Sequence, residues 1–353
     1  MKKILLVLVT LISMQAFGNE GFMQVCNNPT ETQKVTLEVM VKNVFGYKKS
    51  LRGINCDKLY NKFSNSSYYV QVNGTFVSDV SPLQYFTNIK ELSLRNSKIV
   101  DLTPLSHLIN LEDLDLSSNK ITDLSPLGEL KKLESLSLYG NKIKKIPSLE
   151  KLKKLTGLSL SFNEIVDITM ISTIKNLEWV NLSSNKINNY SELEKLTKLT
   201  GIDLGNSQIA DICVLEDMIQ LDSLFIDQNR ISDISCLKKL KNLKYLDLSS
   251  NKVKDISVLA NLNQLKEIDV DENPIKDIQP LIKLHSLEDV SIAATKVEDI
   301  SLLAGLPYLK SLDSVALKLV RCSPKNLEEL KNGKSCYTSE GKLKSWWQRM
   351  LGN

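Results

Sequence analysis

The chain has 353 residues and is rich in Leu, Ile, Asn, Ser, Lys and Asp, whereas Gly numbers 14 and aromatic residues make up 6%. This bias indicates many copies of one short unit and argues against two or three ordinary globular domains. The formal net charge of +4 is too small to indicate a nucleic-acid-binding protein.

The first 18 residues have the pattern of a secretory signal peptide. Lys2 and Lys3 precede an apolar run at residues 4–12, and residues 16–18 (Ala-Phe-Gly) place small side chains at the two positions that a signal peptidase reads. A short membrane anchor is the alternative, but the run is short for a membrane span. No Cys follows it directly, so we expect no lipid anchor. We expect a secreted or periplasmic protein without a transmembrane span.

Residues 19–68 are predicted to form an N-terminal cap. They contain two helix-like stretches, Thr30–Val44 and Asp57–Phe63, and the cysteines Cys26 and Cys56. The end of a repeat array needs such a cap because its last core layer is otherwise exposed. An even number of cysteines in an exported chain favours disulfides, although six cysteines allow 15 connectivities. We expect Cys26 and Cys56 to pair within the cap.

Residues 69–312 repeat every 22 residues. The segment that begins at Leu111, LEDLDLSSNKITDLSPLGELKK, follows the pattern LxxLxLxxNxIxDLxPLxxLxx, and about eleven successive copies keep the same frame without an insertion. Chance does not hold several columns in phase over so long a stretch. The repeat therefore defines the fold of most of the chain.

Each column of the repeat has a physical role. The LxL pair alternates with period two and predicts one short strand per repeat, with the Leu side chains inward and the strands paired in parallel. The Asn that follows each strand is predicted to turn inward and to hydrogen-bond loop backbone groups that would otherwise be buried unpaired. The predicted Asn ladder comprises Asn119, Asn141, Asn163, Asn185, Asn229, Asn251 and Asn273.

The remainder of each repeat predicts a short turn on the opposite side. An Asp is often followed two residues later by Ser or Thr and then Pro, as in Ser125-Pro126, which we interpret as a helix cap with Pro in the first turn. Residues 191–194 (Ser-Glu-Leu-Glu) have the pattern of a capping box. The fold class expected is an α/β solenoid: an arc with a parallel concave β-sheet and short 3₁₀ or helical turns on the convex side.

This repeat resembles the bacterial internalin-type leucine-rich repeat. The resemblance rests on the 22-residue pattern quoted above and covers about two thirds of the chain. It implies a solenoid whose concave sheet engages a protein ligand.

The remaining cysteines and the C-terminus carry three further predictions. Residues 313–340 are expected to form a C-terminal cap with a Cys322–Cys336 disulfide, while Cys213 and Cys236 lie in adjacent coils and are either bridged or free. The tail 341–353 is basic and contains two tryptophans, Trp346 and Trp347. These two rings either fold back onto the cap or make a peripheral contact with a membrane or a partner.

The outward strand positions are predicted to form an acidic concave face. Of 33 such positions, ten are acidic and one, Arg95, is basic. This charge disfavours nucleic acid and favours a basic protein partner. The predicted partner-binding residues are Tyr139, Trp179, Asp203, Phe225, Asp227, Tyr245, Asp247 and Asp269. Trp179 and Tyr245 are expected to bracket a shallow notch as exposed anchors, whereas ordinary exposed sheet residues are the alternative. The stacked acids could also hold Ca²⁺, but a solvated acidic ladder is favoured.

No pattern of an enzyme is present. His107 and His285 have no nucleophile or ligand partner at a telling spacing, and the sequence lacks a Gly-rich phosphate loop, CxxC or HExxH. We expect no catalysis, no cofactor and no metal. The function expected is an exported protein-binding module; the alternative is a structural envelope protein that docks to a membrane or wall through its C-terminal tail.

Overall fold

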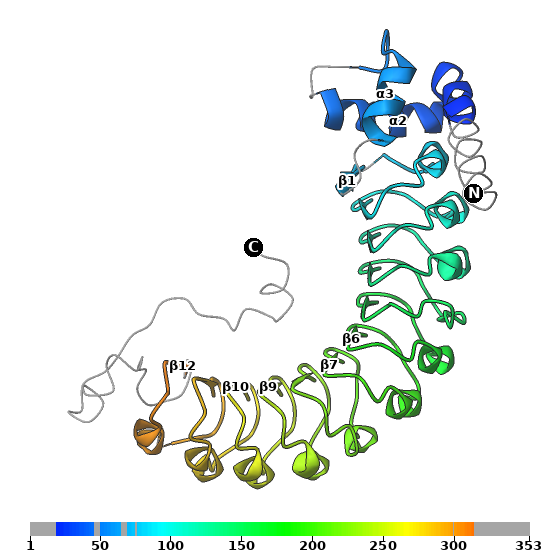
Figure 1. The fold of residues 1–353 in the computed structure, drawn as a ribbon. Helices are drawn as coiled ribbons and strands as arrows, with labels where there is room; N and C mark the ends of the chain where they lie inside the picture. The colour runs from blue at the N-terminus through cyan, green and yellow to red at the C-terminus, as the bar shows by residue number, and fades with distance from the viewer. Residues whose placement is uncertain (1–18, 46–49, 65–68, 75, 299, 314–353) are drawn as a thin grey trace, which may run out of the picture. The chain divides into compact units, whose positions relative to one another are not determined.

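The computed structural model describes residues 19–45, 50–64, 69–74, 76–298 and 300–313 (Figure 1). The predicted signal peptide, the Cys322–Cys336 cap and the tail with Trp346 and Trp347 lie outside these residues. Within the described part, no helix is both long and apolar enough to cross a membrane.

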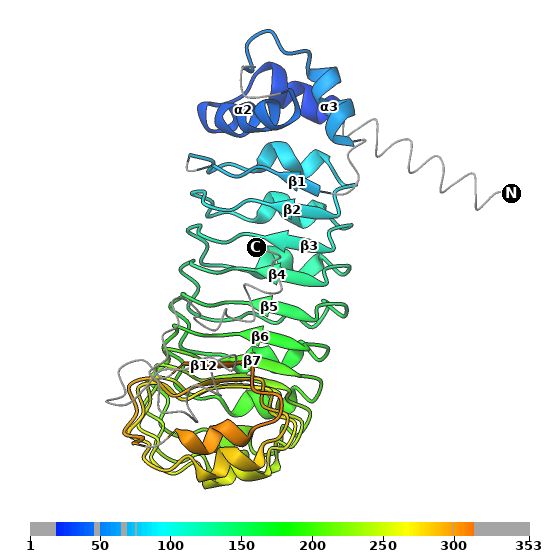
Figure 2. The ribbon, with the colours of Figure 1, turned by 90° about the vertical axis from the view of Figure 1, so that its left-hand side faces the viewer.

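The centre of the protein is one parallel β-sheet whose strands follow each other in chain order (Figure 2). Each strand has three residues, and its central residue is buried. The strands are β1 (Tyr69–Gln71), β2 (Glu91–Ser93), β3 (Asp113–Asp115), β4 (Ser135–Ser137), β5 (Gly157–Ser159), β6 (Trp179–Asn181), β7 (Gly201–Asp203), β8 (Ser223–Phe225), β9 (Tyr245–Asp247), β10 (Glu267–Asp269), β11 (Asp289–Ser291) and β12 (Ser311–Asp313). The register steps by 22 residues, as in the pairing of Asp247 with Asp269.

Short 3₁₀ turns occupy the opposite side of the coils (Figure 1). They are η1 (Ser81–Tyr85), η2 (Thr103–His107), η3 (Ser125–Glu129), η4 (Thr169–Thr173), η5 (Ser191–Lys195), η6 (Cys213–Leu215), η7 (Ser235–Lys239), η8 (Ser257–Asn261), η9 (Gln279–Lys283) and η10 (Ser301–Gly305). The predicted solenoid of parallel strands and 3₁₀ turns is therefore confirmed. The sheet also contains a twelfth strand at the end of the predicted repeat region.

The prediction of Ser and Thr as caps of these turns was wrong. The Asp two residues earlier does this work: Asp101 Oδ1 accepts a hydrogen bond from the Thr103 backbone N–H at 2.8 Å. The expected capping box at residues 191–194 fails in the same way, since Asn189 Oδ1 accepts from the Ser191 N–H at 2.9 Å. An Asp or Asn side chain two residues upstream can accept a hydrogen bond from this free backbone N–H without disturbing the turn.

The chain divides into two compact units. Unit 1 comprises Met1–Val180 and Ile187–Leu196, and unit 2 comprises Asn181–Lys186 and Thr197–Asn353. In unit 2, the 3₁₀ turns spread along the outer side and the strands line the inner side (Figure 1).

The asparagines after the strands bond the coils to one another. Asn119 is buried, and its Nδ2 donates to the carbonyls of Leu94 at 2.8 Å and Leu116 at 2.9 Å. Its Oδ1 accepts from the Ile99 N–H in the preceding coil at 3.0 Å. Each such side chain satisfies backbone groups that the Leu core would otherwise leave without partners.

Helices cover the N-terminal end of unit 1. Residues 19–27 are helical, and α2 (Glu31–Phe45) and α3 (Cys56–Ser64) follow. Phe22 and Phe86 meet with ring centroids 4.9 Å apart, and Phe63 lies 5.3 Å from Phe86. The aromatic rings of the helices thus bury the apolar end of the first coil.

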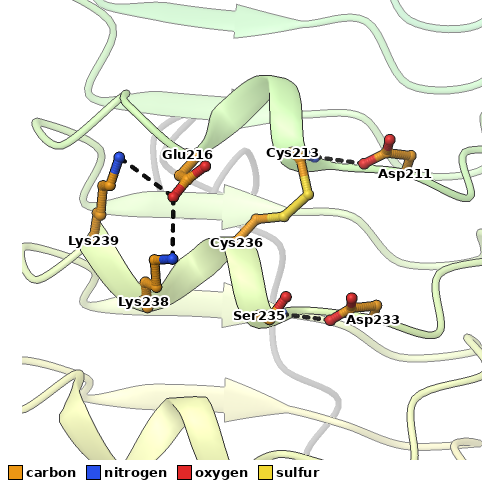
Figure 3. Close-up of a disulfide and its surroundings, with 8 residues drawn as sticks. All are labelled: Asp211, Cys213, Glu216, Asp233, Ser235, Cys236, Lys238 and Lys239. Atoms are coloured by element: carbon orange, nitrogen blue, oxygen red, sulfur yellow. Dashed lines mark hydrogen bonds and ion pairs between the residues drawn. A yellow bond between two sulfur atoms is a disulfide. The ribbon is translucent and has the colours of Figure 1, made fainter.

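Two disulfides lie in the described residues. Cys26–Cys56 joins the helix at residues 19–27 to α3, with the Cα atoms 6.0 Å apart, which confirms that prediction. Cys213–Cys236, which the sequence left open, joins η6 to η7 across two successive coils with a Cα separation of 5.2 Å (Figure 3). Beside it, the carboxylate of Glu216 pairs with both Lys238 and Lys239, at 3.5 and 3.3 Å.

Candidate functional site

The strand side of unit 2 carries a group of carboxylates that we call the acidic face. It comprises Asp203, Asp227, Asp247, Asp269 and Asp271. All five are partly buried, and each of the four consecutive coils of β7, β8, β9 and β10 contributes at least one of them.

The repeat itself places these side chains. Ile202, Leu246 and Ile268 are buried at the centres of β7, β9 and β10, so the alternation of a strand turns the flanking Asp residues outward. Parallel register then sets Asp247 beside Asp269 in the neighbouring strand. The carboxylates form files because every coil has the same length.

Backbone and side-chain donors fix one oxygen of most of these carboxylates. Asp203 Oδ1 accepts from the Gly205 N–H at 2.9 Å, while its Oδ2 accepts from Asn181 Nδ2 at 2.8 Å. Asp247 Oδ1 accepts from the N–H and hydroxyl of Ser249, at 2.9 and 2.7 Å. The side chains are therefore held in one orientation before any partner arrives.

Asp271 and Asp227 complete the face. Asp271 Oδ1 accepts from Ser291 Oγ at 2.7 Å and from the Ala293 N–H at 2.6 Å. Asp227 packs against Gly205, where a Cβ would collide with its carboxylate. Gly205 is therefore needed for the close approach of the Asp227 side chain to the sheet.

Burial and mutual repulsion raise the pKa values of the acidic face. Burial, followed by the charges of Asp247 and Asp271, raises the pKa of Asp269 to about 8. Burial is also the main cause that raises the pKa of Asp203 to about 7 and the pKa values of Asp227 and Asp271 to about 6. Burial raises the pKa of Asp247 in the same direction. Each group holds its proton more tightly because ionisation adds charge to a partly desolvated row.

Aromatic side chains lie within this face. Phe225 pairs in register with Asp203 on one side and with Asp247 on the other, and Tyr245 begins the strand that Asp247 ends. Both rings are half-buried. The predicted combination of carboxylates with Phe225 and Tyr245 is thus brought together on unit 2.

Two other predicted residues belong to unit 1. Trp179 is only 7% exposed, and its neighbours in β6, Val180 and Asn181, are buried as well. The expectation of an exposed Trp179 anchor was therefore wrong, because the strand is covered along its length and the ring surface is already removed from solvent. Tyr139, by contrast, is 40% exposed, and its ring lies 5.1 Å from that of Phe162.

Asp271 and Phe162 were not predicted from the sequence as functional residues. Asp271 lies two residues after the end of its strand. In unit 2 the residues at this position of the repeat are small or polar and uncharged, except for Asp227 and Asp271, so a carboxylate there was a usable signal. Phe162 precedes the ladder residue Asn163, and its φ of 53° lies in the left-handed region. The corresponding residues of the other coils with positive φ are Asn96, Ser118, Gly140, Ser184, Asn206, Gln228, Ser250, Glu272 and Ala294. A bulky apolar side chain in this column was the signal that could have found it.

Among the described residues, one group has its potential ligand atoms close enough to hold a metal ion: Asp211, Cys213 and Cys236. The two sulfur atoms of this group form the disulfide of Figure 3, and Asp211 Oδ1 accepts from the Cys213 N–H at 2.8 Å. The sulfur atoms are used in a covalent bond and the carboxylate in a turn, so this group is explained by the fold.

Comparisons with known proteins agree with the repeat. A family model described as a leucine-rich repeat region matches residues 70–322. No curated protein matches the chain. The structure of an internalin, InlF, from Listeria monocytogenes is 25% identical with a TM-score of 0.64, over 89% of this chain and 99% of InlF.

Two further solved structures support the fold. The functional domain of InlJ from Listeria monocytogenes, described as including a cysteine ladder, is 24% identical with a TM-score of 0.60, over 74% of this chain and 56% of that one. A leucine-rich repeat protein from Leptospira interrogans is 21% identical with a TM-score of 0.61, over 78% of this chain and 89% of that one.

Proposed function

The chain belongs to the leucine-rich repeat family and is of the internalin type, and we propose that its acidic face binds a basic segment of a protein partner outside the cell that makes it. Leucine-rich repeat proteins are protein-interaction modules that bind their partners on an extended sheet surface. Disulfides fit an exported protein.

The observation that carries the proposal is a row of carboxylates without counter-charges. Within the described residues, none of the five Asp side chains of the acidic face forms an ion pair. In unit 1, Asp115 at an equivalent strand position pairs with Arg95 at 3.3 Å. Like charges side by side on a sheet destabilise it. Lys or Arg side chains of a partner would bring the compensating charge, favour the ionised form of these carboxyls, whose pKa values are raised, and relieve the repulsion between them.

The aromatic rings give the same surface its apolar contribution. Phe225 and Tyr245 lie between the carboxylates and expose part of their rings. Interfaces gain most of their energy from a few such anchors, surrounded by polar contacts that exclude water. A basic segment with an apolar side chain between its charges fits this arrangement of Asp203, Phe225 and Asp247.

A paired comparison of variants tests the proposal. The Asp247→Asn, Asp269→Asn double variant removes two ionisable carboxyls from the acidic face, and the Asp217→Asn, Glu272→Gln variant removes two exposed carboxyls elsewhere in unit 2. Each protein is fused to a labelling peroxidase and applied to living cells, and the labelled surface proteins are quantified. We expect the first variant to lose the proteins that the wild type labels and the second to retain them. Equal labelling by both variants would refute the acidic face as the binding surface.

A further inference from the structure

The loops that follow the strands of unit 1 carry a row of lysines that we call the basic edge. It comprises Lys98, Lys120 and Lys142, one in each of three successive coils. A backbone ladder keeps them in register: the Lys120 N–H donates to the Ile99 carbonyl at 3.0 Å, and the Lys142 N–H donates to the Ile121 carbonyl at 2.9 Å. The loops stack one above another in Figure 2. The lysines are all exposed and advance by one coil each.

The ammonium groups of the basic edge have no carboxylate partner within the described residues. Lysines on other parts of unit 1 do pair with a neighbouring coil, as Lys90 with Glu112 at 2.8 Å and Lys154 with Glu134 at 2.7 Å. Asp101 and Asp123 lie in the loops of the basic edge, but their carboxylates accept hydrogen bonds from the 3₁₀ turns that follow. The row therefore keeps a repulsion that a partner with acidic groups would relieve.

Exposed apolar side chains lie along the same loops. Phe76 is 69% exposed, with the Lys98 ammonium 4.9 Å from its ring centre, and Val100 is 54% exposed. Phe162 is 53% exposed and contacts Tyr139. A left-handed φ costs a residue with a Cβ about 1–2 kcal/mol, and a ring that is half in solvent recovers little of that cost. These side chains have the composition of an interface: apolar anchors with charges beside them.

We infer that the occupant of the basic edge is the acidic face of a second copy of this chain. The two surfaces have opposite charge, and in each copy neither is neutralised by the chain itself. Both rows also advance by one coil, about 4.8 Å per strand, so lysines from three coils can face carboxylates from three coils at once. The inference rests on the proposed function, since it uses the same acidic face and names its basic partner.

The basic edge belongs to unit 1 and the acidic face to unit 2, so each copy offers two different surfaces. Two copies can exchange both contacts in a closed dimer, or each copy can contact a further one head-to-tail and form a chain or a ring. Association therefore depends on protein concentration, and salt weakens it because the paired charges are partly exposed.

Charge reversal provides the test, with sedimentation velocity of the full chain over a range of concentrations at low and high salt. The edge variant carries Lys98→Glu, Lys120→Glu and Lys142→Glu. Its matched control reverses a second row of exposed lysines with the same spacing, Lys131, Lys153 and Lys175, which no exposed aromatic ring accompanies. We expect the wild type and the control to associate at low salt. The edge variant should weaken association by about tenfold or more.

Mixing separates charge pairing from misfolding. The face variant carries Asp227→Lys, Asp247→Lys and Asp269→Lys, and it should sediment as a monomer. An equimolar mixture of edge and face variants should associate, since the acidic edge of one now meets the basic face of the other. If the face variant does not fold, a variant with Asp→Asn changes at the same positions replaces it. This variant should associate more weakly than the wild type.

Three outcomes would overturn the inference: a wild type that is monomeric at every concentration and salt, an edge variant that associates like the control, or a mixture that stays monomeric. The proposed function fails separately. A monomeric wild type whose labelling of cell-surface proteins depends on Asp247 and Asp269 would leave that function intact and remove only the second copy as its partner.

Discussion

The strand surfaces of the two units differ although the same repeat builds both. In unit 1, β4 and β5 have only Ser and Gly at their outward positions. In β3, the carboxylate of Asp115 has Arg95 as its counter-ion. In unit 2, every coil from β7 to β10 adds a carboxylate without one. The inward columns are alike in both units. The scaffold and the surface chemistry are therefore set by different columns and can change independently.

The largest effect should come from the inward columns, and it should depend on whether Asn or Ser occupies the ladder position. Asn141→Ala in unit 1 removes the bonds to the Leu116 and Leu138 carbonyls and to the Ile121 N–H, all near 3.0 Å. Leaving these buried groups unpaired should cost about 3 kcal/mol or more. In unit 2 the same column has Ser207, whose hydroxyl donates one bond to the Gly205 carbonyl, so Ser207→Ala should cost about 1 kcal/mol.

Urea unfolding of the two single variants measures this difference. Equal losses of unfolding free energy would show that the ladder position matters equally whichever side chain occupies it. That result would contradict the larger number of hydrogen bonds that Asn141 forms. Asn229 also supports this position, because its Oδ1 accepts from the Ser207 N–H at 3.0 Å. A larger loss for Ser207→Ala than for Asn141→Ala would therefore mean that Asn229 does not compensate for the missing hydroxyl.

The disulfides should have the next largest effect, one in each unit. Replacing Cys26 and Cys56 by Ser opens a loop of 30 residues, and replacing Cys213 and Cys236 opens one of 23. Chain entropy predicts about 3 kcal/mol for each. Hydrogen exchange should locate the loss in the helices of the cap for the first pair and around η6 and η7 for the second.

The variant with Cys26, Cys56, Cys213 and Cys236 all replaced by Ser is the control for both disulfide variants, and its loss of stability should match the sum of theirs. Protection that changes in the cap when only Cys213 and Cys236 are replaced would show that the two units unfold together. That result would remove the distinction between them on which this comparison depends.

The inward columns were also the part that the sequence predicted well. Period two at the Leu pairs, the buried Asn119 and its equivalents, and the 22-residue step are local patterns, and burial follows from them directly. The Cys26–Cys56 pair followed from the need to cap an open end. Position in the repeat alone could not decide whether Cys213 and Cys236 are bridged, because they differ by one column and the approach of the two turns depends on the folded structure.

The outward columns were harder to interpret because exposure depends on neighbours and not on period. The repeat places Trp179 outward, yet it is buried in the structure, whereas Phe162 precedes a buried Asn and is exposed. The acidity of the face was readable from composition. The absence of counter-charges at Asp227 and Asp271 could not be predicted from the sequence, because it depends on the position of every lysine ammonium group in the folded protein.

Acidity should affect the stability of unit 2 through these carboxylates. The pKa of Asp203 is raised to about 7 and that of Asp269 to about 8, above the value near 4 expected in the unfolded chain. Between pH 4 and 8 the folded state thus holds protons that the unfolded state has lost, so stability falls as pH rises. Each pH unit over which the folded state alone keeps a proton costs about 1.4 kcal/mol, so the loss between pH 5 and pH 8 should be on the order of 3 kcal/mol for each of these two carboxyls.

Urea unfolding at pH 5 and pH 8 measures this slope, and the Asp247→Asn, Asp269→Asn variant should flatten it. A wild type that is more stable at pH 8 would mean that the carboxylates are ionised in the folded protein at pH 5. The acidic face would then be better solvated than its burial indicates.

The smallest effect on stability should come from Phe162 in unit 1. Phe162→Asn exchanges a strained apolar residue for one that tolerates a positive φ, a relief of about 1–2 kcal/mol. It also loses the ring contact with Tyr139, about 0.5–1.5 kcal/mol. The two terms nearly cancel, so thermal unfolding should move little, whereas self-association should weaken if the ring is an anchor of the basic edge. A large loss of stability would show instead that Phe162 holds the coil together, and the exposed ring would then need no partner to explain it.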